Sequence, residues 1–213
     1  MPLEHNKLKE AISKAVEVGK GRRFKQSVEM IVVLRDIDPK SQAGKIREIV
    51  VLPKGRGKKQ KICVVADGEL AEKAKSAGAF MVISSAELGS IGKKQAKKIA
   101  SSCDWVLVRT DLMAQVGRVL GPALGPRGKP PVPMPPSADI SMLIKRYENS
   151  VVVRTKEQPQ LSVAIGTEDM SLEDLVENAN SVLGLLESKL PAGMGNVDRI
   201  LFKTTMGPAV EAV

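Results

Sequence analysis

The side chains that could support acid–base, nucleophilic or metal chemistry are few in this chain. His5 is the only histidine, and it lies near a terminus that we expect to fray. This leaves no base for a catalytic triad and no pair of histidine ligands. Cys63 and Cys103 are 40 residues apart, which is not a zinc-binding spacing. The carboxylate pairs at 36–38 and 168–169 fit turns and helix starts, where acids commonly gather. We therefore predict no enzyme, no catalytic residue, no metal and no cofactor.

Phosphate-binding loops are also missing from the sequence. Residues 89–94, GSIGKK, lack the spacing of a Walker loop, and no G-x-G-x-x-G follows the first strand expected in the middle of the chain. Residues 55–58, GRGK, form only a basic turn. An α/β nucleotide-binding enzyme stays open as an alternative because of the expected fold of the middle part alone, and fold does not imply function.

The most distinctive segment is residues 117–136, GRVLGPALGPRGKPPVPMPP, with four glycines, seven prolines and no acidic side chain. Because proline fixes φ and lacks an N–H, whereas glycine readily adopts φ > 0, we expect neither helix interior nor central strand here. The segment would be a long, stiff loop that presents Arg118, Arg127 and Lys129. A flexible proline-rich linker is the alternative. The apolar side chains of the segment favour a packed loop, and its cations suit a polyanion such as RNA.

Charge supports a polyanionic partner. The formal net charge is +9, and it is unevenly distributed. Residues 1–59 carry 15 basic against 7 acidic side chains and residues 60–154 carry 14 against 8, whereas residues 155–213 carry 4 against 9. Such a surplus is typical of nucleic-acid binders. Aromatic residues are only 2% of the chain, so contacts with RNA shape and backbone would have to dominate over base stacking.

The cellular context is read from the cysteines and the apolar pattern. No apolar run approaches transmembrane length, and residues 1–10 are charged throughout, so neither a membrane nor secretion is expected. Cys63 and Cys103 lie in apolar segments without a pairing signature. We predict that both are reduced core residues of a cytoplasmic protein.

Two kinds of periodicity divide the chain. The outer parts combine helices with antiparallel-type strands: helix Leu3–Lys20, strands Ser27–Asp36 and Ile46–Leu52, strands Val151–Lys156 and Leu161–Ile165, a helix capped by Ser171, and a last strand Arg199–Thr205. The middle alternates strand and helix: Lys61–Ala66, Glu69–Ala77, Phe80–Ile83, Ala86–Ala100, Trp105–Arg109 and Leu112–Leu120, with a further helix at Ala138–Tyr147 after the proline-rich segment.

Strict alternation of this kind predicts βαβ units on a parallel sheet. The outer parts are each too small to bury a sufficient core alone. We therefore predict a mixed α/β and α+β protein with two domains. Residues 1–53 and 150–213 would form one discontinuous α+β domain, and residues 54–149 an inserted Rossmann-like three-layer α/β domain.

Several motifs in combination resemble one known family, and the likeness spans almost the whole chain. They are FKQSVE at 24–29, LPKGRGK at 52–58, GRVLG at 117–121, LGPRGK at 124–129 and KTTMGP at 203–208. Together they resemble the universal large-subunit ribosomal protein L1 family of the mobile lateral stalk. The stretches TKEQPQ at 155–160 and IGTE at 165–168 resemble its archaeal branch.

The resemblance implies a cytoplasmic, ribosome-bound protein whose discontinuous domain binds helical ribosomal RNA. It further implies that the inserted domain swings on two hinges and assists release of exit-site tRNA. Repression of its own translation through its mRNA and a monomeric free state are also expected. Carried over by motif, the RNA-binding residues would be Arg23, Phe24, Lys25, Lys156, Thr205, Met206, Gly207 and Pro208. Arg118, Arg127 and Lys129 would face tRNA.

The residue chemistry agrees with that assignment. Thr205 offers a hydroxyl to a 2′-OH or phosphate, Met206 can pack on sugars and bases, and Gly207 permits close backbone approach. Two positions depart from the family pattern: Arg199 replaces a small serine, and Lys25 replaces Thr or Asp. A stand-alone RNA-binding regulator and a basic protein-interaction module remain as alternatives.

Overall fold

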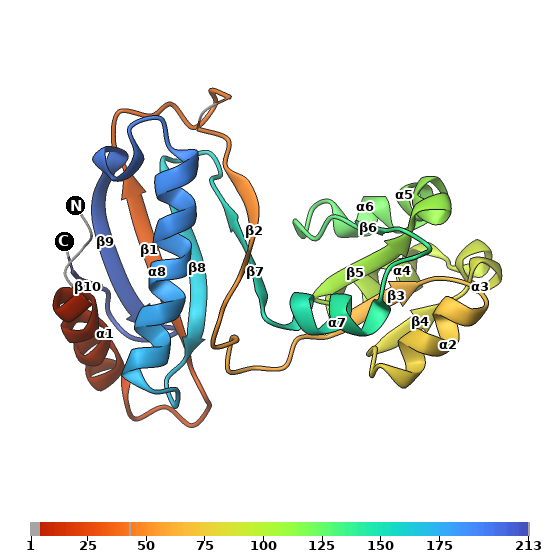
Figure 1. The fold of residues 1–213 in the computed structure, drawn as a ribbon, viewed down its shortest axis with the longest axis horizontal. Coiled ribbons are helices and arrows are strands. Elements are labelled where there is room, and N and C mark those ends of the chain that lie inside the picture. Colours follow the sequence, from red (N-terminus) through yellow and green to blue (C-terminus); the bar gives the residue numbers. More distant parts are fainter. Residues whose placement is uncertain (1–4, 43, 213) are drawn as a thin grey trace. The chain divides into compact units, whose positions relative to one another are not determined.

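The computed structural model describes residues 5–42 and 44–212 and divides into two compact units (Figure 1). Unit 1 comprises Met1–Lys58 with Asn149–Val213, and unit 2 comprises Lys59–Glu148. Unit 1 contains antiparallel sheets and unit 2 a parallel sheet, each with helices. The predicted mixed α/β and α+β class is therefore confirmed.

Unit 1 is built on a four-stranded sheet in the order β10-β9-β1-β8, beside a two-stranded sheet of β2 and β7. Every pair in both sheets is antiparallel. The elements of unit 1 are α1 (His5–Gly19), β1 (Ser27–Leu34), β2 (Arg47–Val51), β7 (Ser150–Arg154), β8 (Gln160–Thr167), α8 (Leu172–Lys189), η2 (Gly193–Asn196), β9 (Val197–Thr204) and β10 (Val210–Glu211).

The two long helices of unit 1, α1 and α8, cover one face of the four-stranded sheet (Figure 1). Along β1 every second side chain is buried, from Val28 to Leu34, because these residues face the helices. Leu8, Ile12, Leu183 and further apolar residues of the two helices complete this core. The alternate residues of β1 point to the other face, which we call the open face. Helix α1 begins within the expected segment, whose residues 3 and 4 lie outside the described part.

Unit 2 has a parallel sheet in the order β4-β3-β5-β6 between two helical layers. Alternate residues of β3 and β5 pack against α3 to α6, while the others lie toward α2 and α7. The elements are β3 (Ile62–Val65), α2 (Glu69–Ser76), β4 (Met81–Ile83), α3 (Ser85–Ser90), α4 (Lys93–Ser102), β5 (Trp105–Arg109), η1 (Thr110–Leu112), α5 (Met113–Val119), α6 (Gly121–Leu124), β6 (Val132–Met134) and α7 (Ile140–Glu148).

The prediction of one long loop over residues 117–136 is wrong in part. Pro122 occupies the first turn of the short helix α6, where its missing N–H has no helical partner in any case. Pro133 lies in β6, an edge strand, where the absent donor costs no second ladder bond. The loop prediction thus failed because proline is tolerated in the first turn of a helix and in an edge strand, and these two prolines occupy such positions.

The predicted helix Ala86–Ala100 is also wrong as a single element. The chain forms two helices, α3 and α4, because Ile91 and Gly92 adopt extended backbone angles between them. The N–H of Gly92 donates to Oε1 of Gln95 at 3.2 Å, which starts the second helix.

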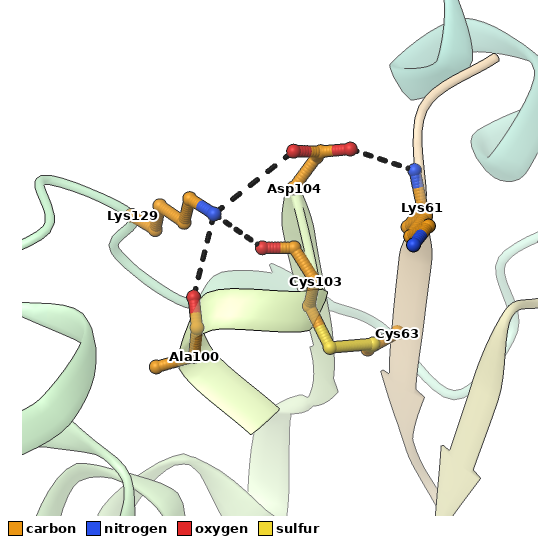
Figure 2. The surroundings of a disulfide bond; sticks show 6 residues. All are labelled: Lys61, Cys63, Ala100, Cys103, Asp104 and Lys129. Carbon is orange, nitrogen blue, oxygen red and sulfur yellow. Dashed lines mark hydrogen bonds and ion pairs between the residues drawn. A yellow bond between two sulfur atoms is a disulfide. The ribbon is translucent and has the colours of Figure 1, made fainter. Parts of the chain in front are cut away.

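The prediction that both cysteines are reduced is contradicted by a disulfide bond between Cys63 and Cys103 (Figure 2). The sulfurs join β3 to the residue that follows α4, with Cα atoms 5.7 Å apart. Both residues are fully buried. A separation of 40 residues carries no pairing signature, and the pairing of β3 with β5, which begins two residues after Cys103, brings the two cysteines together.

Candidate nucleic-acid interface

The end of β9 and the start of β1 bring the C-terminal motif beside the N-terminal one. The backbone N–H of Thr205 donates to the carbonyl of Ser27, and the N–H of Ser27 donates to Oγ1 of Thr205, both at 3.1 Å. The N–H of Met206 then donates to Oε1 of Gln26 at 3.0 Å, across 180 residues of sequence. Residues 23–25 and 205–208 thus form one surface, which we call the motif surface.

Two large apolar side chains of the motif surface are exposed. Phe24 is 50% and Met206 57% accessible to solvent, whereas Phe202, two residues before Thr204, is completely buried. An exposed aromatic ring and a flexible thioether can pack on nucleotide sugars and base faces. Their positions on neighbouring loops give the motif surface an apolar centre.

The cations around Phe24 differ in their partners. Arg22 and Arg23 are exposed and make no ion pair with the residues that the structure describes. Lys25 is different, because its ammonium lies 2.5 Å from a carboxylate oxygen of Asp169. The hydrogen bond from Lys25, and then one from the hydroxyl of Thr167, lower the pKa of Asp169. A phosphate at Lys25 would therefore compete with an internal carboxylate.

The packing of the protein itself explains why residue 207 is a glycine. A Cβ atom there would lie 2.4 Å from Oγ1 of Thr204 and 3.1 Å from Cα of Gly19, at the end of α1. A Cβ on Gly19 would lie 2.1 Å from the same Thr204 oxygen. The turn after β9 can pack against α1 only because both residues lack side chains. Close approach of RNA to Gly207 stays a prediction.

The open face extends the motif surface along the sheet. Arg199, Lys203 and Thr205 alternate with the buried residues of β9 and therefore share this face. Arg199 is exposed, and its Nε lies 3.4 Å from the carboxylate of Asp198. Arg199, which departs from the family pattern, therefore points to the same face of the sheet as Thr205.

Lys156 is not brought next to the motif surface. It follows β7 in the turn before β8, and β8 starts at Gln160, which pairs with Val33 at the opposite end of β1 from Ser27. Six residues of strand correspond to about 20 Å. Lys156 lines a groove with Arg154, Gln158, Ile31 and neighbouring residues. Lys156 and Phe24 could therefore contact one ligand only if that ligand is elongated.

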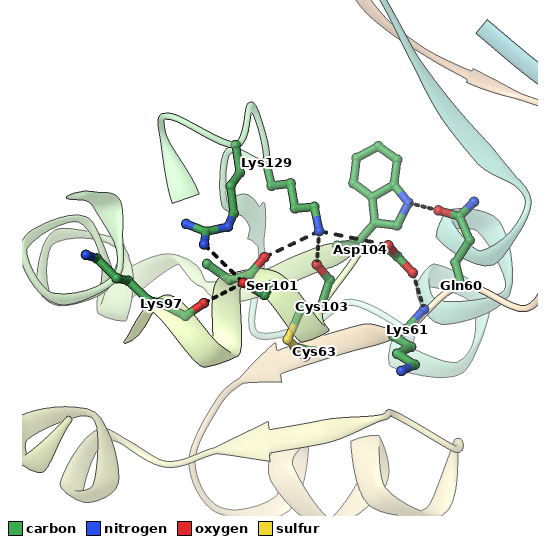
Figure 3. Close-up of polar contacts among 11 residues, drawn as sticks. Gln60, Lys61, Cys63, Lys97, Ser101, Cys103, Asp104 and Lys129 are labelled. Carbon is green, nitrogen blue, oxygen red and sulfur yellow. Dashed lines mark hydrogen bonds and ion pairs between the residues drawn. A yellow bond between two sulfur atoms is a disulfide. The ribbon is translucent and has the colours of Figure 1, made fainter. Parts of the chain in front are cut away.

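In unit 2, two of the three predicted tRNA-facing cations are bound to the protein itself. The ammonium of Lys129 donates to the carbonyls of Cys103 at 2.7 Å and Ala100 at 3.3 Å and lies 3.9 Å from Asp104 (Figure 3). Arg127 donates to the carbonyl of Ala123 and the hydroxyl of Ser101, each at 3.0 Å. These contacts attach the glycine- and proline-rich segment to α4. Arg118 is exposed at the end of α5.

A basic surface of unit 2 was missed in the sequence. Helix α4 exposes Lys93, Lys94, Lys97 and Lys98, and no acidic residue lies within the helix. Like charges at i and i+4 destabilise a helix. This spacing was visible in KKQAKK and is the signal that could have marked the surface.

The described ranges hold neither a metal-ligand cluster nor a membrane-spanning helix. Among residues 5–42 and 44–212, no three His, Cys, Asp or Glu side chains cluster closely enough to bind a metal ion. Within the same ranges, no helix has the length and apolar content needed to cross a membrane.

Comparison with known proteins identifies the family. The sequence model of the "Ribosomal protein L1p/L10e family" matches residues 8–208. The chain belongs to this family. It is 60% identical to "Large ribosomal subunit protein uL1" of Staphylothermus marinus, with all of both chains covered. Identities to proteins of the same name from Hyperthermus butylicus and Aeropyrum pernix are 50% and 52%, over 96% of this chain and 94% of each relative.

Membership in the L1p/L10e family confirms the predicted resemblance and its archaeal branch. It also confirms the ribosome-bound, cytoplasmic location and the prediction that the chain is not an enzyme. The alternative of a nucleotide-binding enzyme is thereby removed.

Proposed function

We propose that this ribosomal protein is a structural component of the large subunit and binds helical ribosomal RNA through the motif surface and the open face of unit 1. One observation carries the proposal: Phe24 and Met206 are exposed on adjacent loops beside Arg22 and Arg23, which are exposed and make no ion pair with the described residues. The relatives named as large-subunit proteins support the same assignment.

The elongated open face supports a double-helical ligand. Thr205 lies at one end of the sheet and Lys156 beyond the other, and the stretch of β1 from Ser27 to Val33 between these ends is about 20 Å long. A-form RNA presents 2′-hydroxyls and phosphates along a wide minor groove, which suits hydroxyl and cationic contacts better than base stacking. The small number of aromatic residues agrees with such a mode.

Sedimentation tests the ribosomal assignment. In cell extract at moderate salt, the protein should travel with large subunits, and its absence from them would refute the proposal.

A second test joins residue 53 to residue 150 through a short Gly/Ser link. Because all members of the core of unit 1 lie outside residues 59–148, this deletion should fold and keep most of its affinity for ribosomal RNA. Loss of affinity in a folded deletion would place the RNA on unit 2.

The finer roles concern further RNA partners. We propose that the same surface of unit 1 binds the protein's own mRNA and represses translation, and that unit 2 assists release of exit-site tRNA as it swings on two hinges. For tRNA, the exposed Arg118 and the lysines of α4 are better candidates than Arg127 and Lys129, whose donors already have partners. We expect the free protein to be a monomer.

These roles are separable by experiment. Replacing the four lysines of α4 with glutamine should weaken tRNA crosslinking on the ribosome without changing affinity for ribosomal RNA. Lys73 and Lys75 of α2 provide a matched control, because they too are exposed lysines of unit 2.

Repression should be lost with Met206→Ala in a reporter that carries the protein's own leader. Repression that survives this change would assign it to another surface.

A further inference from the structure

Gln26 is a completely buried polar residue between the two halves of the motif surface. Its side-chain Oε1 accepts the N–H of Met206 at 3.0 Å. Its Nε2 donates to the carbonyl of Gly19 at 2.7 Å and to Oε2 of Glu168 at 3.0 Å. One amide group thus joins the end of α1, the segment after β8 and the turn after β9.

The partners of this amide specify its chemistry. Gly19 and Glu168 present acceptors, so the group that faces them must donate, whereas the N–H of Met206 requires an acceptor. The side-chain amide of Gln26 supplies both, with two N–H donors on Nε2 and an acceptor at Oε1. The backbone of Gln26 is held by two hydrogen bonds with Glu168. The N–H of Gln26 donates to Oε1 of Glu168 at 2.9 Å, and the carbonyl of Gln26 accepts the backbone N–H of Glu168 at 3.1 Å. From this fixed backbone, the glutamine side chain is long enough to reach all three partners.

Gln26 is therefore placed to hold the positions of two exposed side chains, Phe24 and Met206, although it is itself buried. Phe24 lies two residues before it on the same loop, and Met206 is bonded to it directly. With no exposed surface of its own, Gln26 has no atom available for RNA. We propose that Gln26 is a positioning residue of the RNA interface, holding Phe24 and Met206 in the arrangement that RNA binds. This inference rests on the proposed function of the motif surface.

The first test replaces Gln26 with methionine, which has similar length and no polar donor. The amide of Met206 loses its acceptor, so its hydrogen exchange in the free protein should become about two- to ten-fold faster. Affinity for ribosomal RNA should fall about ten-fold. Gln60→Met is the matched control: Gln60 is also buried and hydrogen-bonded, but to Glu148 and Trp105 in unit 2. It should change neither measurement.

A second variant gives a readout that general destabilisation does not imitate. In Gln26→Glu the acceptor for Met206 is kept, but a carboxylate faces the carboxylate of Glu168. Two carboxylates that share a site raise the pKa of one of them. RNA affinity relative to wild type should therefore be reduced at pH 8 and recover toward pH 5, as a shared proton restores the donor. The adjacent Asp169 stays ionised over this range, because Lys25 lowers its pKa.

The outcomes distinguish the inference from the proposed function. If Gln26→Met folds and leaves both Met206 exchange and RNA affinity unchanged, the positioning role is refuted. If it does not fold, a pH-independent affinity ratio for Gln26→Glu refutes it instead. If the wild type binds no ribosomal RNA, the proposed function fails, and Met206 exchange alone decides whether Gln26 positions this turn.

Discussion

Reduction of the Cys63–Cys103 disulfide should lower the stability of unit 2 strongly. The bond connects residues 40 apart, and the chain-entropy model gives about 4 kcal/mol for a closed loop of that length. For a unit of about 90 residues, each kcal/mol moves Tm by about 4–8 °C. We therefore expect the transition of unit 2 to fall by about 15–30 °C when the full chain is refolded in a reducing agent.

Calorimetry of the oxidised and reduced full chain measures this shift. Because both cysteines of the chain lie in unit 2, the transition of unit 1 and the affinity for ribosomal RNA should not change. The variant with Cys63→Ala and Cys103→Ala is the control, and its Tm should be insensitive to the reducing agent. Equal Tm values for oxidised and reduced wild type would refute the loop-closure reasoning.

Four further predictions concern the interface and pH. The logarithm of affinity for ribosomal RNA should fall against the logarithm of salt concentration with a slope of roughly −4 to −5, if about 4–6 cations contact phosphate; a flat titration would contradict this. Met206→Ala should cost about 1–3 kcal/mol of RNA binding at unchanged Tm, because its side chain is mostly exposed; a large fall in Tm with normal binding by the folded fraction would place Met206 in the core. Asp169→Asn should raise RNA affinity, measured at matched salt, because Lys25 loses its competing carboxylate; unchanged affinity would mean that Lys25 does not contact phosphate. Stability should be constant above about pH 5 and fall below about pH 4. The pKa of Asp67 is lowered in the folded state, first by the backbone N–H of Ser85, so its contribution is lost as pH falls through that pKa. Denaturant unfolding at several pH values checks this, and undiminished stability at pH 3 would contradict it.

The elements that were predicted well from the sequence are those in which the order of apolar and polar residues follows the burial of the side chains. In β1, alternation of Val28, Met30 and Val32 with half-exposed neighbours follows the two faces of the sheet. The strand β3 is buried on both faces and has the continuous apolar run typical of a parallel sheet. These patterns depend on local spacing alone, so no knowledge of distant contacts was needed.

The failures depend on contacts that local spacing does not encode. Whether Pro133 is tolerated depends on β6 being an edge strand, which is a property of sheet order. The disulfide depends on the pairing of β3 with β5, which places Cys103 beside Cys63. For the site, Phe24 and Met206 were named from motifs, but the side chain that joins them, Gln26, lies inside one of those motifs and received no role. Its function depends on contacts 7, 142 and 180 residues away.

The sheet order of unit 1 has a consequence for synthesis. β1 is hydrogen-bonded on its two sides to β8 and β9, both of which lie in the last third of the chain. During translation, β1 therefore lacks both partner strands while all of unit 2 is synthesised and can fold. The motif surface needs both Phe24 and Met206, which lie on either side of unit 2 in the sequence, so a growing chain cannot form this surface before Met206 has been made. Only chains in which unit 2 and β9 have already been made can compete for RNA through this surface, so any feedback through it would respond to chains that contain both units.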